Sequence, residues 1–174
     1  MNAGNHHLGE PDCILGIDPG LANTGYGLIK KNQGSISLVD FGCIRTSKGM
    51  AFSRRLSVIY NEVSIIIDRY HPKCVSIEGL FFYKNAKSAL LVGQAKGVVL
   101  LSAVHQNVPI FEYTPLEVKK AIVGYGSGTK DQIQKMVRLI LKLEKKPEPG
   151  HAADALAVAI CASNDSLRKT KEVL

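Results

Sequence analysis

The sequence contains no tryptophan, and its four cysteines lie far apart along 174 residues. None of them has the Cys-x-x-Cys spacing of a zinc site or a redox pair. Cys13, Cys43 and Cys74 fall in apolar runs that are typical of strands. We therefore expect reduced cysteines in the core of a cytoplasmic protein, rather than a disulfide framework or a zinc site.

Long uninterrupted apolar runs are also missing. Lys96, Gly97 and His105 break the longest candidates, so we expect no membrane span. The opening stretch MNAGNHHLGEPDC is polar and has no apolar segment of the kind found in secretory signals. We expect residues 1–12 to form a disordered leader and residues 164–174 to form a basic flexible tail.

Acidic residues are in the minority, with 15 Asp and Glu against 22 Lys and Arg and a formal net charge of +7. A basic protein of this size often binds nucleic acid, because neutralising phosphates releases counterions. Charge alone is weak support, since many basic proteins bind no nucleic acid.

The order of apolar segments predicts one domain over residues 13–163. Three consecutive strands come first, and later strands alternate with helices, which predicts an α/β fold with a mixed five-stranded sheet flanked by helices. The expected strands are 13–17, 23–29, 36–44, 74–77 and 108–113. The expected helices are about 53–70, 86–106, 115–123, 130–145 and 151–163.

Four ionisable residues stand where a site would form in such a fold. Asp18 ends the first strand, and Glu78 follows the fourth. His151 and Asp154 lie on the first turn of the last helix, on one face because they are three residues apart. Ligands of open α/β sheets gather at the carboxyl ends of strands, and clustered carboxylates need a cation to neutralise them. The pattern therefore favours a site for Mg²⁺ or Mn²⁺.

Each of these residues also has an ordinary explanation. Asp18 begins an Asp-Pro-Gly turn, where aspartate is common, and the helix dipole favours an acid at the position of Asp154. Glu78 could be an exposed acid, and a lone histidine such as His151 is more often structural than a ligand. Their joint placement is what favours the metal site.

Basic and aromatic residues suggest a nucleic-acid surface. Residues 124–128 are glycine-rich and lead into a predicted helix with a Thr129/Gln132 capping box, which suits a phosphate but does not match a Walker A loop. Phe81 comes three residues after Glu78, with Lys84 close behind it, and could stack on unpaired bases, although one of the adjacent phenylalanines Phe81 and Phe82 belongs equally well in a core. One side of the 130–146 segment is basic, either for DNA or as a solvated face: Lys135, Arg138, Lys142, Lys145 and Lys146.

Four segments in order resemble the motifs of the bacterial Holliday junction resolvase family RuvC. They are ILGIDPGLANTGYGLI, VSIEGLFFYKNAKSALLVGQAKGV, FEYTPLEVKKAIVGYGSGTKDQI and HAADALAVAI. The resemblance runs from about residue 14 to 163. It implies an RNase H-like fold, a homodimer, and an endonuclease that nicks two strands of a four-way DNA junction in recombination and repair. It also implies the RuvA–RuvB branch-migration complex as a partner.

The resemblance further implies roles for single residues. The acids of the family correspond to Asp18, Glu78 and Asp154, and two Mg²⁺ ions, replaceable by Mn²⁺, would activate water and stabilise the leaving oxygen. The DNA contacts would include Phe81 as a wedge, with Lys119 and Lys130 near the scissile phosphate.

His151 departs from the commoner family pattern, in which an aspartate precedes the last acid by three residues. The change removes one negative charge and adds a softer nitrogen donor, which should shift metal preference toward Mn²⁺. His151 is either a metal ligand or a general base toward water. Two other functions stay open: a junction-binding module without catalysis, and an actin-like nucleotide-binding domain, against which the short chain argues.

Overall fold

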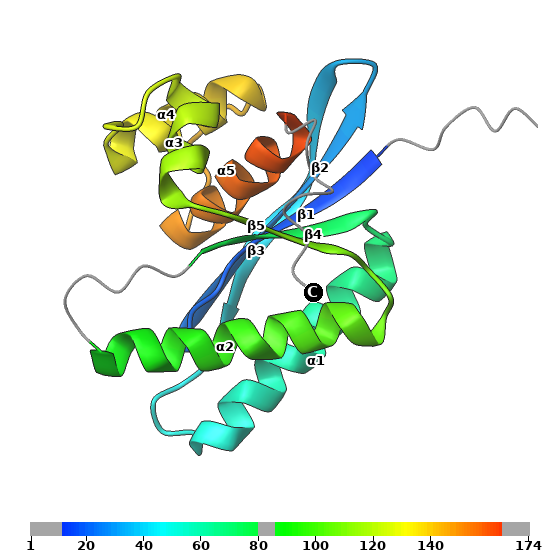
Figure 1. Cartoon of the computed structure of the whole chain (residues 1–174), viewed down its shortest axis with the longest axis vertical. Coiled ribbons are helices and arrows are strands. Elements are labelled where there is room, and N and C mark those ends of the chain that lie inside the picture. Colours follow the sequence, from blue (N-terminus) through cyan, green and yellow to red (C-terminus); the bar gives the residue numbers. More distant parts are fainter. Residues whose placement is uncertain (1–11, 80–85, 165–174) are drawn as a thin grey trace, which may run out of the picture.

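The structure, a computed structural model, describes residues 12–79 and 86–164 (Figure 1). Phe81 and Lys84 lie outside the described residues, as do residues 1–11 and 165–174 of the predicted leader and tail. Within the described part, Asp12 belongs to the first strand and Asn164 to the last helix.

The elements follow the predicted order. The strands are β1 (Asp12–Asp18), β2 (Asn23–Asn32), β3 (Ser35–Arg45), β4 (Cys74–Glu78) and β5 (Ile110–Tyr113). The helices are α1 (Phe52–Tyr70), α2 (Ala86–His105), α3 (Pro115–Val123), α4 (Lys130–Ile140) and α5 (Gly150–Asn164).

The strands form one sheet in the order β3-β2-β1-β4-β5, which confirms the predicted mixed sheet. β1, β2 and β3 are antiparallel neighbours, whereas β4 is parallel to β1 and β5 is parallel to β4. A two-residue turn joins β2 to β3, with φ of 39° at Gln33 and 89° at Gly34. Positive φ at both positions matches the twist of a hairpin.

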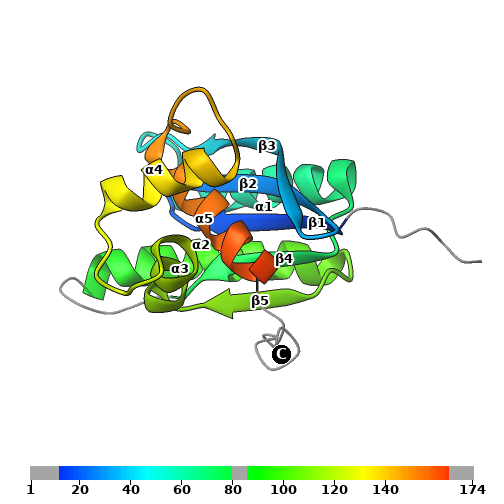
Figure 2. The ribbon, with the colours of Figure 1, turned by 90° about the horizontal axis from the view of Figure 1, so that it is seen from above.

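Helices cover both faces of the sheet (Figure 2). α1 and α2 pack against one face, and α3, α4 and α5 lie on the other (Figures 1 and 2). α5 is the central helix of its layer: from Ala152 to Ser163 every residue except Asp154 is buried. Gly16 permits this close packing, because a Cβ atom there would lie 2.1 Å from the carbonyl oxygen of Ala155.

The predicted helix over 130–145 is wrong at its end. α4 stops at Ile140, where the amides of Lys142 and Leu143 donate to the carbonyls of Leu139 and Arg138. This is a Schellman ending, with Lys142 in the left-handed region at φ 54°. Lys142, Lys145 and Lys146 therefore do not extend the basic face of α4.

One helix also departs from expectation in its composition. The segment Ser88–His105 of α2 is long and apolar enough to cross a membrane by length and composition, so Lys96 does not interrupt it as expected. One such helix is weak evidence, because core helices pass the same test. Ala95, Val99 and Ala103 of this helix are buried in the protein, while Leu90 and Val104 are exposed.

The four cysteines all lie within the described residues, and Cys13, Cys74 and Cys161 are buried. The burial of these three agrees with the expected position of the cysteines in the core. Cys43, on β3, is only partly buried.

Candidate active site

The site begins where two parallel strands end side by side. Ile17 of β1 pairs with Ile77 of β4, so Asp18 and Glu78 are the next residues on adjacent strands. Ile17 and Ile77 are fully buried toward α1 and α2. Because side chains alternate along a strand, both carboxylates project from the opposite face, the one that α5 covers.

The first turn of α5 brings two more groups to the same edge. His151 and Asp154 share one face of this turn, and the amide of Ala152 donates to the carbonyl of Pro149 just before it. Gly25, opposite Asp18 in the β1–β2 register, lets the turn approach the sheet. A Cβ atom on Gly25 would lie 2.0 Å from the carbonyl oxygen of His151.

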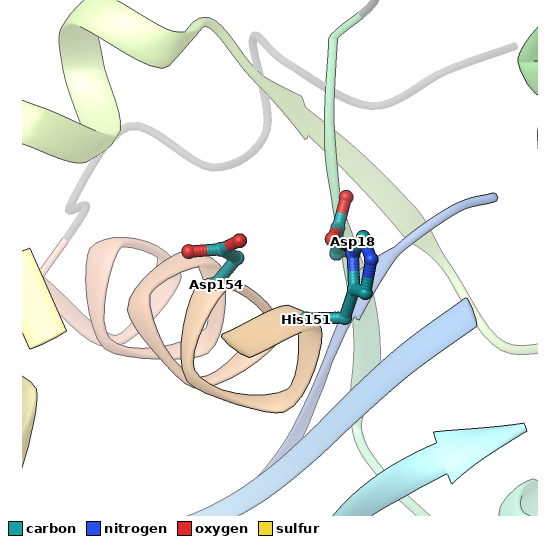
Figure 3. A group of neighbouring side chains, drawn as sticks. All are labelled: Asp18, His151 and Asp154. Atoms are coloured by element: carbon teal, nitrogen blue, oxygen red, sulfur yellow. Dashed lines mark hydrogen bonds and ion pairs between the residues drawn. The ribbon is translucent and has the colours of Figure 1, made fainter. Parts of the chain in front are cut away.

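Three of the predicted site residues converge closely (Figure 3). His151 Nδ1 lies 2.7 Å from Asp18 Oδ2. One donor atom from each of Asp18, His151 and Asp154 lies within 4.8 Å of the others, and this is the group of potential metal ligands found among the described residues. Glu78 lies outside that tight group but within electrostatic range of Asp18 and Asp154.

Burial and mutual repulsion raise the pKa values of two acids of the site, Asp18 and Glu78. Burial raises the pKa of Asp18, while its hydrogen bond with His151 acts in the opposite direction. Burial, followed by the charges of Asp18 and Asp154, raises the pKa of Glu78 from 4.5 to about 7. Clustered carboxylates behave in this way when nearby cations neutralise them only in part.

Two lysines lie beside the acids. Lys130 Nζ lies 2.6 Å from Asp154 Oδ2, and this hydrogen bond is the largest cause of a raised pKa at Lys130. Lys119 lines a small pocket of about 60 Å³ together with Glu78 and Asp154. The positive charges of Lys130 and Lys119 partly offset the rise in the pKa of Glu78.

The remaining predicted DNA contacts lie on the exposed face of α4 or outside the described residues. Lys135 is exposed and pairs with Asp131 at 2.8 Å, and Arg138 is exposed near the end of the helix. The predicted capping box is confirmed: Thr129 Oγ1 accepts from the amide of Gln132, and Gln132 Oε1 accepts from the amide of Thr129.

A larger hollow of about 430 Å³ lies elsewhere, between β3 and α1. At its wall, Asp40 accepts hydrogen bonds from the hydroxyl groups of Tyr26 and Tyr70. Judged by volume alone, this hollow would be the stronger candidate for the functional site. The groups that can hold a metal and activate water, however, converge at Asp18, so that smaller site is the stronger candidate for chemistry.

The donor set fits a divalent cation. Asp18, Glu78 and Asp154 offer carboxylate oxygens, and the imidazole of His151 offers a nitrogen. Hard divalent ions prefer oxygen donors, and Mn²⁺ also accepts an imidazole readily. The arrangement can therefore bind a divalent cation.

Comparisons with known proteins agree with this geometry. The family model for crossover junction endodeoxyribonuclease RuvC matches residues 14–162. A RuvC from Moorella thermoacetica is 51% identical over 148 residues, covering 85% of this chain and 89% of the relative. A RuvC from Alkaliphilus oremlandii is 55% identical over 148 residues, covering 85% of this chain and 90% of the relative.

A solved structure of Thermus thermophilus RuvC in complex with a Holliday junction substrate is also similar. It superposes with a TM-score of 0.86 at 34% identity, covering 93% of this chain and 99% of the solved chain. The yeast mitochondrial Holliday junction resolvase Ydc2 shares the fold, with a TM-score of 0.61 at 12% identity over 90% of this chain and 81% of that one.

Proposed function

The chain belongs to the RuvC family of crossover junction endodeoxyribonucleases, whose fold is RNase H-like, and we propose that it resolves four-way DNA junctions at the Asp18 site. It acts as a metal-dependent nuclease in homologous recombination and DNA repair. The observation that carries the proposal is the convergence of Asp18, His151 and Asp154 at the ends of β1 and α5.

The acids of the site would hold the metal. Asp18 is central, because it neighbours Glu78 along the sheet and hydrogen-bonds His151. We assign two Mg²⁺ ions to the site, with Mn²⁺ able to replace them. When bound, such ions help to deprotonate the attacking water and to stabilise the leaving 3′-oxygen.

His151 is assigned as a metal ligand rather than a general base. One of its ring nitrogens already lies within the group of donor atoms, and its Nδ1 lies 2.7 Å from Asp18 Oδ2. The ring nitrogen that binds the metal must be unprotonated.

Lysines would position the junction. Lys119 and Lys130 lie beside the acids and suit the scissile phosphate, while Lys135 and Arg138 on α4 suit the flanking backbone. Phe81, as a stacking wedge, and Lys84 remain predictions, because they fall outside the described residues.

Paired nicking requires two active sites, which a homodimer with two-fold symmetry provides. The exposed apolar face of α2 suits that contact: Leu90, Leu101 and Val104 are 62%, 48% and 59% exposed. We further propose a cytoplasmic location and, from family membership, the RuvA–RuvB complex as a partner.

The direct test is cleavage of a mobile four-way junction with Mg²⁺ or Mn²⁺. We expect paired, metal-dependent nicks from the wild type and none from Asp18→Asn, with junction affinity retained by the variant. A wild-type protein that binds junctions and never cuts them would instead be a binding module with a decayed site.

A further inference from the structure

We infer, resting on the metal site proposed above, that Lys130 takes the place of a cation in the metal-free site and exchanges with the metal. In this exchange the ammonium of Lys130 leaves Asp154 when a divalent ion binds, and it then becomes free to contact the phosphate of the substrate. Metal binding and the contact with the DNA phosphate would be coupled through the side chain of Lys130.

The contacts of Lys130 support a cation-like position. Its Nζ lies 2.6 Å from Asp154 Oδ2, and Asp154 is one of the three residues whose donor atoms converge. Lys130 also interacts electrostatically with Asp18 and Glu78. A single ammonium therefore partly neutralises three carboxylates from three different elements.

The position of Lys130 on its own helix is otherwise unfavourable. It is the first residue of α4, just after the N-cap Thr129. The positive end of the helix dipole disfavours a cation there, and Asp131 at the next position is the type that the dipole favours. Since the helix dipole of α4 does not favour Lys130 at this position, the carboxylates of the site explain the orientation of the Lys130 side chain better.

Lys130 is also able to move while its backbone stays in place. The capping box between Thr129 and Gln132 fixes the start of α4. The side chain is 60% exposed, whereas that of Asp154 is only 23% exposed. Its end lies beside Gly150, where a Cβ atom would be 3.8 Å from Nζ.

The exchange follows from the shared carboxylate of Asp154. A metal on Asp154 and an ammonium at 2.6 Å from the same carboxylate would be adjacent like charges. The more mobile of the two partners is the lysine stem, because the carboxylate is fixed on a buried helix. The site therefore releases the lysine and not the aspartate.

Two measurements on the full chain without DNA test the exchange. The first is the rate at which an amine-acylating reagent modifies Lys130, followed by mass spectrometry with and without saturating Mg²⁺. We expect at least about a threefold faster reaction with Mg²⁺, because an amine released from its ion pair with Asp154 is more accessible to the reagent. Lys120, exposed on α3, serves as the internal control and should not change.

The second measurement is Mn²⁺ affinity by calorimetry. Lys130→Met should bind Mn²⁺ about two- to fivefold more tightly, the range expected for loss of an exposed competing ion pair. Lys130→Arg, which keeps the charge, should stay within about twofold of the wild type. Lys120→Met, with the same loss of charge, should also stay within about twofold.

The outcomes separate the exchange from the proposed function. If the wild type binds Mn²⁺ and Mg²⁺ but Lys130 reacts at the same rate with and without metal, the exchange is wrong and the metal site stands. If the wild type binds neither ion, the metal site itself is wrong, and the exchange falls with it.

Discussion

Glu78 should destabilise the metal-free protein, and its removal should stabilise the fold. The carboxyl sits at the end of β4 beside Asp18, and its pKa is raised from 4.5 to about 7 by burial and by the neighbouring acids. Glu78→Gln keeps the shape of the side chain and removes the charge. We therefore expect the variant to unfold at a higher urea concentration at pH 8 when EDTA removes metals.

The size of the effect follows from the pKa. A tenfold change in proton affinity corresponds to about 1.4 kcal/mol, so the full rise from 4.5 to about 7 amounts to about 3 kcal/mol. Glu78 is only partly buried, and solvent screening reduces this value. We expect Glu78→Gln to add about 1–2 kcal/mol to the free energy of unfolding at pH 8.

The pH dependence gives the sign of the effect. Because the folded-state pKa is raised, the protonated carboxyl favours the folded state fully below about pH 4.5, and this contribution is lost as pH rises through about 7. The difference between variant and wild type should therefore be near zero at pH 4.5 and largest at pH 8. Urea unfolding at four pH values between these limits measures it.

Glu62→Gln, at an exposed position on α1, is the matched control and should show no such trend. Adding Mn²⁺ should stabilise both proteins, because the metal binds the folded state. The wild type should gain more, because Glu78→Gln lacks one of the carboxylates proposed to hold the metal. A variant that is less stable than the wild type at pH 8, or a difference that does not change with pH, would refute the electrostatic reasoning.

Three further predictions concern other parts of the account. His151→Asp should preserve cleavage and shift the ratio of Mn²⁺- to Mg²⁺-supported activity toward Mg²⁺, because an oxygen donor replaces nitrogen; complete loss of metal-dependent cleavage would argue for a base. Gly25→Ala should lower the free energy of unfolding by about 1–3 kcal/mol in urea and weaken Mn²⁺ binding, since its Cβ meets the His151 carbonyl, whereas Gly49→Ala should do neither. Leu101→Glu should shift sedimentation toward monomer, and an unchanged dimer would place the interface elsewhere.

The acids of the site could be predicted from the sequence because they occupy ends of elements. Asp18 and Glu78 are the last residues of two apolar strands, and parallel neighbours end at the same edge. His151 and Asp154 open a helix that is apolar along its length. Periodicity and position are enough to predict that these residues lie near one another.

Three other features depend on tertiary packing and could not be predicted from the sequence pattern: the end of α4, the ion pair of Lys130 and the role of Gly25. Neither glycine nor proline marks the end of α4, and a lysine takes the left-handed position there instead. The ion pair between Lys130 and Asp154 joins residues on two helices whose relative placement the periodicity leaves undetermined. The role of Gly25 depends on the distance between β2 and α5, which is also a property of the folded state.

The family match also decides between functions that composition left open. An actin-like nucleotide-binding domain would also open with a strand, Gly-Ile-Asp and a glycine turn, so the first motif alone does not separate it from a nuclease. The match over residues 14–162 supports the nuclease and leaves the nucleotide-binding alternative without support.

The central claim is that the metal lies between Asp18 and the first turn of α5, and anomalous scattering from crystals soaked in Mn²⁺ tests it most directly. The account predicts an anomalous peak in coordination contact with carboxylate oxygens of Asp18 and Asp154, and its loss in Asp18→Asn. Mn²⁺ peaks found only away from these residues, in crystals where the site is open to solvent, would contradict it.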